Sequence, residues 1–304
     1  MHNNILVIVN KNSGTSDPTI LHNLYKKLTE NKVNYEIKIT KCLDDLDHIM
    51  INTIHKYDGV VVVGGDGTVF HLLQRLKTIS SGVPIGVIPC GSGNGLVNSL
   101  LYHKNKTIFN NNIDDVIDDI LRFNTTKLDL IEVRSDNNII YSFLFLSYGL
   151  FTNIDIGTDW LRWMGTVRFT IGAIFQLLMK SSIYGELEYK NGENDWITER
   201  GMFIHFMANN LSHTSNDSIT SPHSKVDDGL IYITYIKEPC SRWRLLKVLL
   251  GLSDGSFIDH VTYVPTTEFK FKTNAVLDID GEPMDFSFKE IHCKSIKEGI
   301  SLYN

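Results

Sequence analysis

The sequence has few cysteines, no excess of basic residues and no long apolar run, and each absence excludes a class of protein. Its 304 residues contain four cysteines, Cys42, Cys90, Cys240 and Cys293, far apart and without a CxxC pair. This spacing excludes a disulfide framework and a zinc site, and reduced thiols indicate a cytosolic setting. Lysine plus arginine is 29 against 35 for aspartate plus glutamate, a net charge of -6, so we expect no nucleic-acid partner. No segment approaches the roughly 20 apolar residues that cross a bilayer, so any membrane contact is expected to be peripheral.

The first 120 or so residues alternate apolar runs with helical patterns. The runs at residues 5–9, 35–39, 60–63 and 83–88 predict strands, and residues 19–28, 43–55 and 69–79 predict the helices between them. Strands that are apolar along their whole length belong to parallel sheets covered on both faces. The pattern predicts a Rossmann-like, doubly wound α/β domain over residues 1–124, to which the C-terminal tail, about residues 293–304, returns.

The sequence pattern changes from alternating strands and helices to mostly strands after about residue 124. Apolar runs at residues 127–133, 139–146, 187–189, 202–207, 230–236, 261–264, 268–271 and 276–279 predict strands, and residues 160–179 and 242–252 predict helices. Short strands separated by turn signals such as Asp228-Gly229 are typical of a sandwich. The sequence therefore predicts a β-rich sandwich domain over residues 125–292.

A glycine-rich turn follows the strand at residues 60–63. It reads Gly64-Gly65-Asp66-Gly67-Thr68 and is followed by a helical pattern. Glycines allow close approach of the backbone, so amides and a helix N-terminus can face phosphate oxygens. An acid in such a turn does not bind phosphate, but Asp66 can accept a proton from a hydroxyl nucleophile or face a metal. The alternative is a turn with a structural carboxylate.

Two further turns follow strands at the same predicted sheet edge. One runs from Asn10 through Ser13, Gly14 and Thr15, and the other is the segment PCGSGNG at residues 89–95, which contains Ser92, Gly93 and Asn94. Three such turns at the carboxyl ends of parallel strands favour a nucleoside triphosphate site.

These turns resemble the diacylglycerol kinase catalytic-domain superfamily, and GSGN at residues 91–94 resembles its sphingosine kinase branch. The likeness continues in SYGLFTNID (147–155), LRWMGTVRFTIG (161–172), SPH (221–223), DDGL (227–230), YVP (263–265) and DGE (280–282). The resemblance implies an ATP- and Mg²⁺-dependent lipid kinase that phosphorylates the primary hydroxyl of sphingosine or a related sphingoid base, giving sphingosine 1-phosphate. It further implies a cytoplasmic protein in transient peripheral contact with membranes, and it leaves the oligomeric state open, a homodimer included.

The resemblance also assigns roles to individual residues. Asp66 would be the general base and Asp155 would bind the substrate ammonium. The nucleotide would lie on Asn10, Ser13, Gly14, Thr15, Gly64, Gly65, Gly67, Thr68, Ser92, Gly93 and Asn94, with Arg162, Arg168 and Glu282 nearby. Asp280 and Glu282 would hold the metal, and Leu150, Phe151, Ile171 and Phe175 would contact the lipid.

The sequence departs from the family pattern three residues after Thr68. Family members usually have a glutamate there, whereas this chain has His71, and a neutral imidazole does not supply the same negative charge. Three alternatives stay open from the sequence: a sphingosine kinase, a diacylglycerol-type or other lipid kinase, and a catalytically weakened homologue that binds lipid or nucleotide.

Overall fold

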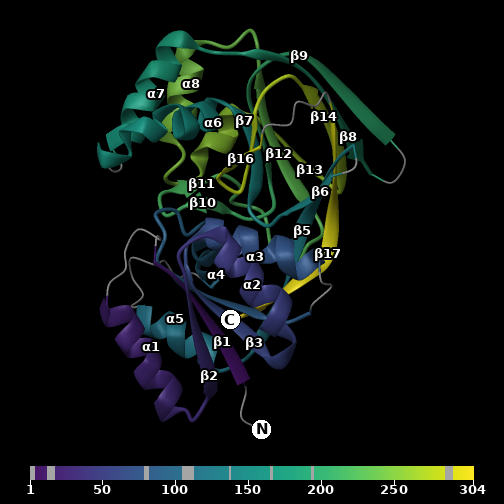
Figure 1. Cartoon of the computed structure of the whole chain (residues 1–304). Helices are drawn as coiled ribbons and strands as arrows, with labels where there is room; N and C mark the ends of the chain where they lie inside the picture. The colour runs from purple at the N-terminus through teal and green to yellow at the C-terminus, as the bar shows by residue number, and fades with distance from the viewer. Residues whose placement is uncertain are drawn as a thin grey trace. The chain divides into compact units, whose positions relative to one another are not determined.

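The structure is a computed structural model that describes residues 4–11, 18–78, 82–104, 113–136, 138–164, 167–192, 195–284 and 290–304. The chain forms two compact units (Figure 1). Unit 1 comprises Met1–Leu130, Thr214–Asn216 and Lys297–Asn304, and unit 2 comprises Ile131–His213 and Asp217–Ile296. Residue 124, the predicted domain boundary, directly precedes the strand β5 (Thr125–Ser135), along which the chain passes from unit 1 into unit 2. The boundary itself stays a prediction.

Unit 1 is built on a parallel sheet of valine- and isoleucine-rich strands. Its elements are β1 (Asn4–Asn10), α1 (Pro18–Glu30), β2 (Asn34–Thr40), α2 (Leu43–Thr53), η1 (Ile54–Lys56), β3 (Gly59–Gly64), α3 (Asp66–Thr78), β4 (Ile85–Pro89), α4 (Gly95–His103) and α5 (Ile113–Leu121). The strand order is β2-β1-β3-β4, with Leu302 of β17 (Ile291–Tyr303) paired to Ile85 of β4. The predicted α/β fold with a parallel sheet is confirmed.

Helices α1 and α5 cover one face of this sheet. Leu24 and Leu28 of α1, with Ile117 and Ile120 of α5, join the buried cluster that lines the sheet. Both faces of β3 are buried, because every one of its six residues is covered. Burial on both faces explains why these strands are apolar along their whole length.

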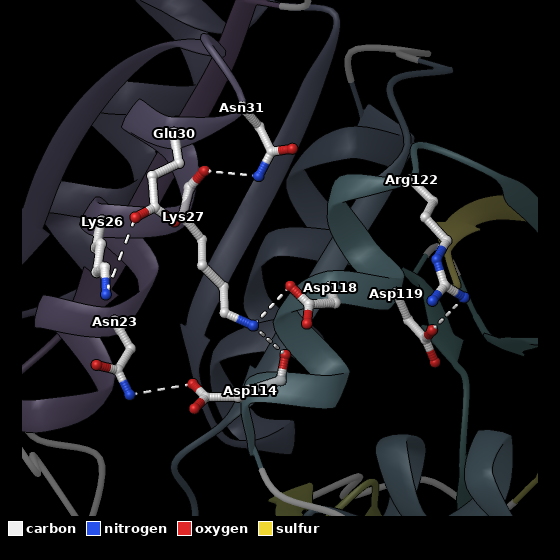
Figure 2. Close-up of polar contacts among 9 residues, drawn as sticks. All are labelled: Asn23, Lys26, Lys27, Glu30, Asn31, Asp114, Asp118, Asp119 and Arg122. Atoms are coloured by element: carbon white, nitrogen blue, oxygen red, sulfur yellow. Dashed lines mark hydrogen bonds and ion pairs between the residues drawn. The ribbon is translucent and has the colours of Figure 1, made fainter.

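A polar contact ties α1 to α5 at the edge of this apolar cluster (Figure 2). The Lys27 ammonium lies 2.6 Å from a carboxylate oxygen of Asp118 and donates a hydrogen bond of 2.9 Å to the carbonyl of Asp114. Asn23 donates a hydrogen bond of 3.0 Å to the Asp114 carboxylate. The ion pair holds α5 on α1 in a defined register along the two helices.

Unit 2 is rich in antiparallel strands. Its elements are β6 (Asn138–Ser142), β7 (Phe145–Gly149), α6 (Leu150–Asp155), η2 (Ile156–Met164), α7 (Val167–Met179), β8 (Ile183–Asn191), β9 (Asp195–Asn209), β11 (Ser218–Ile219), β12 (Ile231–Lys237), α8 (Arg242–Leu250), η3 (Ser256–His260), β13 (Thr262–Thr266), β14 (Glu268–Thr273), β15 (Leu277–Ile279) and β16 (Glu282–Met284). The end of β5 and the start of β17 also belong to unit 2, and β10 (His213–Ser215) is divided between the units after His213. The sheet order is β16-β15-β7-β9-β8-β14-β17, and β12 pairs with β9 and β13. The expectation of a strand-rich C-terminal part is confirmed.

Helices α6, α7 and α8 gather beside the strands of unit 2 (Figure 1). They share a buried apolar cluster, which contains Leu150, Ile154, Ile204, Ile236, Cys240, Leu245, Val248 and Phe257 and which we call the helical cluster. No helix in the described part of the chain is long and apolar enough to cross a membrane.

Two element predictions for unit 2 were wrong in detail. The expected single strand at 139–146 is split into β6 and β7 by a turn at Phe143 and Leu144, whose amides bind the Asp280 carboxylate. The expected helix at 160–179 begins instead within the 3-10 helix η2, and α7 starts at Val167. At the turn between β6 and β7, the contact with Asp280 joins segments that are distant in the sequence.

Candidate active site

Two glycine-rich turns of unit 1 pack backbone against backbone. A Cβ atom placed on Gly65 would lie 2.8 Å from the Cα of Gly91, and one placed on Gly91 would lie 2.5 Å from the Cα of Gly65. The amide of Cys90 donates a hydrogen bond of 2.9 Å to the Gly64 carbonyl, which extends the pairing of β3 with β4 into the turns. Glycine is required at both positions because any side chain would force the two turns apart.

Asp66 belongs to the first of these turns, at the N-terminus of α3, and its side chain reaches the start of α4 after the second turn. Its carboxylate accepts hydrogen bonds from the amide of Gly95 at 2.8 Å and from the amide of Leu96 at 3.2 Å. Both amides belong to the first turn of α4, where the helix dipole favours negative charge. Burial raises the pKa of Asp66, while the hydrogen bonds act in the opposite direction. Each carboxylate oxygen accepts one of these bonds and retains a lone pair for another donor.

The second turn is locked by Asn94. Its side chain accepts a hydrogen bond of 2.9 Å from the Gly91 amide and donates one of 2.8 Å to the Gly91 carbonyl. Asn94 is buried and adopts a left-handed backbone with φ of 54°, a conformation that asparagine tolerates better than most residues. The exposed Ser92 and the half-buried Gly93 therefore sit on a rigid loop at the start of α4.

The remaining predicted nucleotide residues of unit 1 divide into two groups. Asn10, at the end of β1, donates a hydrogen bond of 2.8 Å to the hydroxyl of Thr68, so the structure brings the first strand together with the Gly64–Thr68 turn. Gly67 is half-buried in the first turn of α3. Ser13, Gly14 and Thr15 lie outside the described residues.

Sequence reasoning missed two asparagines that support the second turn. Asn216 donates a hydrogen bond of 3.2 Å to the Ser92 carbonyl and accepts one of 2.8 Å from Asn98. Asn98 also donates to the Asn94 carbonyl at 3.0 Å. Asn216 is separated from Asn98 by 118 residues, and nothing in the local pattern around residue 216 indicates this contact.

Asp280 makes the contacts of a structural carboxylate. It accepts a hydrogen bond of 2.7 Å from the Ser142 hydroxyl and bonds of 2.9 Å from the amides of Phe143, Leu144 and Phe145. Burial raises its pKa to about 6 against these hydrogen bonds. Three of these bonds go to one carboxylate oxygen and one to the other, so the turn between β6 and β7 uses most of the acceptor capacity of Asp280. Its role as a metal ligand stays a prediction.

The described ranges contain no group of three or more histidine, cysteine, aspartate or glutamate side chains that could hold a metal ion. Glu282, the other predicted metal ligand, lies in β16 and is half-buried. Mg²⁺ in kinases is commonly bound by one or two carboxylates together with the substrate phosphates, so its assignment here stays a prediction.

The predicted lipid-contacting residues lie in two different environments of unit 2. Leu150 is buried in the helical cluster, and the Phe151 ring packs on that cluster, 4.6 Å from the His205 ring between centroids. Ile171 and Phe175 lie instead on the exposed side of α7, with 40% and 56% of their surface exposed. The structure therefore places two of the four residues in or on the helical cluster and two on the exposed side of α7, and their contact with a lipid stays a prediction.

The three predicted charged residues of unit 2 lie on neighbouring helices. Asp155 is the last residue of α6, Arg162 lies in η2, and Arg168 is the second residue of α7, where its side chain is half-buried. Their roles toward phosphate and ammonium stay predictions.

The chain is similar to known lipid kinases. Residues 4–133 match the family model of the diacylglycerol kinase catalytic domain. Sphingosine kinase 1 of Arabidopsis thaliana is 25% identical over 344 residues, which cover 95% of this chain and 70% of the plant protein. Sphingosine kinase 1 of Caenorhabditis elegans is 25% identical over 386 residues, which cover 99% of this chain and 81% of the nematode protein.

Solved structures share the fold. A crystal structure of a proposed diacylglycerol kinase from Bacillus anthracis str. Sterne matches with a TM-score of 0.78 at 18% identity and covers 99% of this chain and 95% of the bacterial chain. The solved structure shows the fold, and the family match of residues 4–133 together with the sphingosine kinase relatives supports a lipid kinase. Within that superfamily, the relatives that match over most of the chain confirm the resemblance to the sphingosine kinase branch.

Proposed function

We propose that this kinase transfers the γ-phosphoryl group of ATP to the primary hydroxyl of a sphingoid base, with Asp66 as the general base. The observation that carries the proposal is the position of Asp66 between two closely packed glycine-rich turns and the N-terminus of α4. The sphingosine kinase relatives support the substrate class.

Asp66 performs the proton transfer in this proposal. The substrate hydroxyl donates its proton to a carboxylate oxygen of Asp66 as the hydroxyl oxygen attacks the γ-phosphorus and the bond to the β-phosphate bridging oxygen breaks. The pKa of Asp66 is raised, and a carboxylate with a raised pKa is a stronger proton acceptor than one with the ordinary value. The amides of Gly95 and Leu96 hold the carboxylate in one orientation.

The turns supply the phosphate contacts. Helix α3 begins at the first turn, and amides at the N-terminus of a helix are suited to bind phosphate oxygens. At the start of α4, the amides of Gly95 and Leu96 are already bound to Asp66. Arg162 and Arg168 neutralise charge that develops on the transferred group. When Mg²⁺ is bound, it neutralises phosphate charge, and Glu282 is the residue that would hold it.

Asp155 selects the substrate by charge. A sphingoid base carries an ammonium next to the reacting hydroxyl, and diacylglycerol carries none. At about 4 Å, a carboxylate attracts the ammonium by roughly 4 kcal/mol at an effective dielectric constant of 20, and the net gain is smaller after desolvation. Asp155→Ala is therefore expected to lower the use of sphingosine without changing ATP binding, and an unchanged substrate profile would remove Asp155 from the proposal.

Helix α7 makes the peripheral membrane contact. Its exposed apolar side chains are Val167, Ile171, Ile174, Phe175, Leu178 and Met179, each 40–63% exposed. Positions 167, 171, 174–175 and 178–179 recur every three to four residues, so these side chains form one stripe along the helix. A stripe of this kind fits the interface of a lipid bilayer, from which the substrate is drawn.

The test is a transfer assay with radiolabelled ATP, Mg²⁺ and either sphingosine or diacylglycerol in detergent micelles. Label in sphingosine phosphate alone supports the proposal, and label in phosphatidic acid moves the substrate to diacylglycerol. Asp66→Asn is expected to lower turnover by roughly 10²–10⁴-fold with folding retained, as judged by circular dichroism. Wild-type turnover in that variant would remove Asp66 as the base.

A substitution at His71 distinguishes an active kinase from a catalytically weakened homologue. If neither lipid is labelled while ATP still binds, His71→Glu tests whether the missing glutamate is the reason. A large gain in rate on that change would assign the loss to His71, and no change would show that the position is tolerant.

A further inference from the structure

His205 is a fully buried polar side chain in an apolar part of unit 2. It lies in β9, opposite Gly149 at the end of β7, and its exposed fraction is zero. Its ring is 4.6 Å from the ring of Phe151, which itself packs against Phe257 of the helical cluster. The surroundings of the imidazole are therefore apolar on the side of α6 and η3.

One nitrogen of this imidazole has no hydrogen-bond partner. Nε2 lies 3.1 Å from the hydroxyl of Thr234, whereas Nδ1 is buried and has no partner in the described part of the chain. Burial lowers the pKa of His205 to about 3, so the ring is neutral and Nδ1 either donates or accepts a single hydrogen bond. A buried polar atom without a partner costs stability, and a ligand that supplies the partner removes that cost.

The position of His205 relative to α6 indicates which part of a ligand would meet it. Phe151, which contacts the imidazole, precedes Asp155 by four residues on the same helix, which is about one turn or roughly 5 Å along the axis. In the proposed function, Asp155 binds the ammonium of the lipid. If Asp155 binds the amine, the carbon atoms just beyond it are the part of the lipid that would meet His205.

We propose that His205 Nδ1 forms a hydrogen bond with an additional hydroxyl group near the head of the lipid, and that it makes the enzyme prefer long-chain amino alcohols carrying that hydroxyl. The inference rests on the proposed function and deepens it by naming the substrate class. A site that pairs with a substrate hydroxyl disfavours the analogue without it, because the polar atom of the site is then left unpaired.

The experiment compares 4-hydroxysphinganine with sphinganine, two saturated lipids that differ by one hydroxyl. For the wild-type protein, we expect kcat/KM for 4-hydroxysphinganine to exceed that for sphinganine by about tenfold. The ratio is the readout because a general loss of structure lowers both values together, whereas loss of the hydroxyl contact lowers only one.

Two substitutions separate the two ring nitrogens. The side-chain amide of asparagine lies at the position of Nδ1, and that of glutamine at the position of Nε2. His205→Asn is therefore expected to keep the preference, and His205→Gln is expected to bring the ratio to about one while activity on sphinganine is retained. An equal preference in the glutamine variant and the wild type would overturn the proposal.

The remaining outcomes are also decisive. If the wild type phosphorylates both lipids equally well, the role of His205 is refuted and the proposed function stands. If it phosphorylates neither, the proposed function fails and the role of His205 fails with it. Should both variants lose their fold, ¹⁵N NMR of histidine-labelled wild type decides: the Nδ1 resonance should shift with 4-hydroxysphinganine and not with sphinganine, and equal shifts overturn the proposal.

Discussion

The contact between the two glycine-rich turns can be tested by adding one methyl group. In Gly91→Ala, the new Cβ would lie 2.5 Å from the Cα of Gly65, whereas carbon atoms in favourable contact are at least about 3.5 Å apart. The turns must therefore separate by about 1 Å. Because the Asp66 carboxylate is held by amides that follow the second turn, the displacement reaches the proposed general base directly.

This displacement sets the expected size of the effect. Overpacking of this kind costs about 1–3 kcal/mol of stability, and a shift of about 1 Å in a reacting group costs roughly 100-fold in rate. We expect Gly91→Ala to fold, to unfold at lower urea concentration and to lose about 100-fold in turnover. The rate is measured with labelled ATP at a temperature where circular dichroism shows that the variant is folded.

Gly82→Ala is the matched control. A Cβ atom at Gly82 meets nothing within 4 Å, so stability should change by no more than about 0.5 kcal/mol and turnover should not change. If Gly91→Ala kept wild-type turnover and stability, the close packing of the turns would not control the site, and the reasoning from their contact would be refuted.

Three further predictions follow from individual side chains. Burial raises the pKa of Asp66, and a base must be ionised to accept a proton. We therefore expect kcat/KM to fall as the pH falls through this raised pKa, which lies above the value of about 3.9 for an exposed aspartate. A pH profile that is flat down to about 3.9 would contradict this prediction. Lys27→Met should lower the free energy of unfolding in urea by about 1–2 kcal/mol, because it removes the partly buried contact with α5. The control Lys26→Met removes an exposed ion pair and should lower it by at most about 0.5 kcal/mol. Equal losses would show that the Lys27 contact does not stabilise the protein more than an exposed pair. Asp280→Asn should cost about 1–3 kcal/mol, because the amide cannot accept all four hydrogen bonds, and a thermal melt no lower than that of the exposed control Asp195→Asn would show that the turn does not need the carboxylate.

Local patterns in the sequence determined most of unit 1. Buried parallel strands must be apolar on both faces, so β1 and β3 are visible as continuous runs of valine and isoleucine. The helices between them are visible from their period. The Gly64–Thr68 turn could be found because a run of four valines ends at it, and the turn lies at the edge where ligands of such sheets bind.

Other features of the site could not be predicted, because they join segments that are distant in the sequence. The need for glycine at position 65 is clear only from its contact with Gly91, and Asn216 reaches the second turn from a segment more than 100 residues further along the chain. Likewise, only the structure shows that Asp280 accepts hydrogen bonds from the turn between β6 and β7, more than 130 residues away in the sequence.

The same division applies to unit 2. The apolar content of α7 is evident from the sequence, but only the structure shows which of its side chains are exposed and which are covered. His205 gave no signal at all, since a single histidine among apolar strand residues has no period or motif. Its significance comes from burial together with an unpaired nitrogen. Periodicity and turn chemistry act between neighbours along the chain and can be seen in the sequence, whereas burial and hydrogen-bond partners depend on which distant segments meet, and only the tertiary structure decides that.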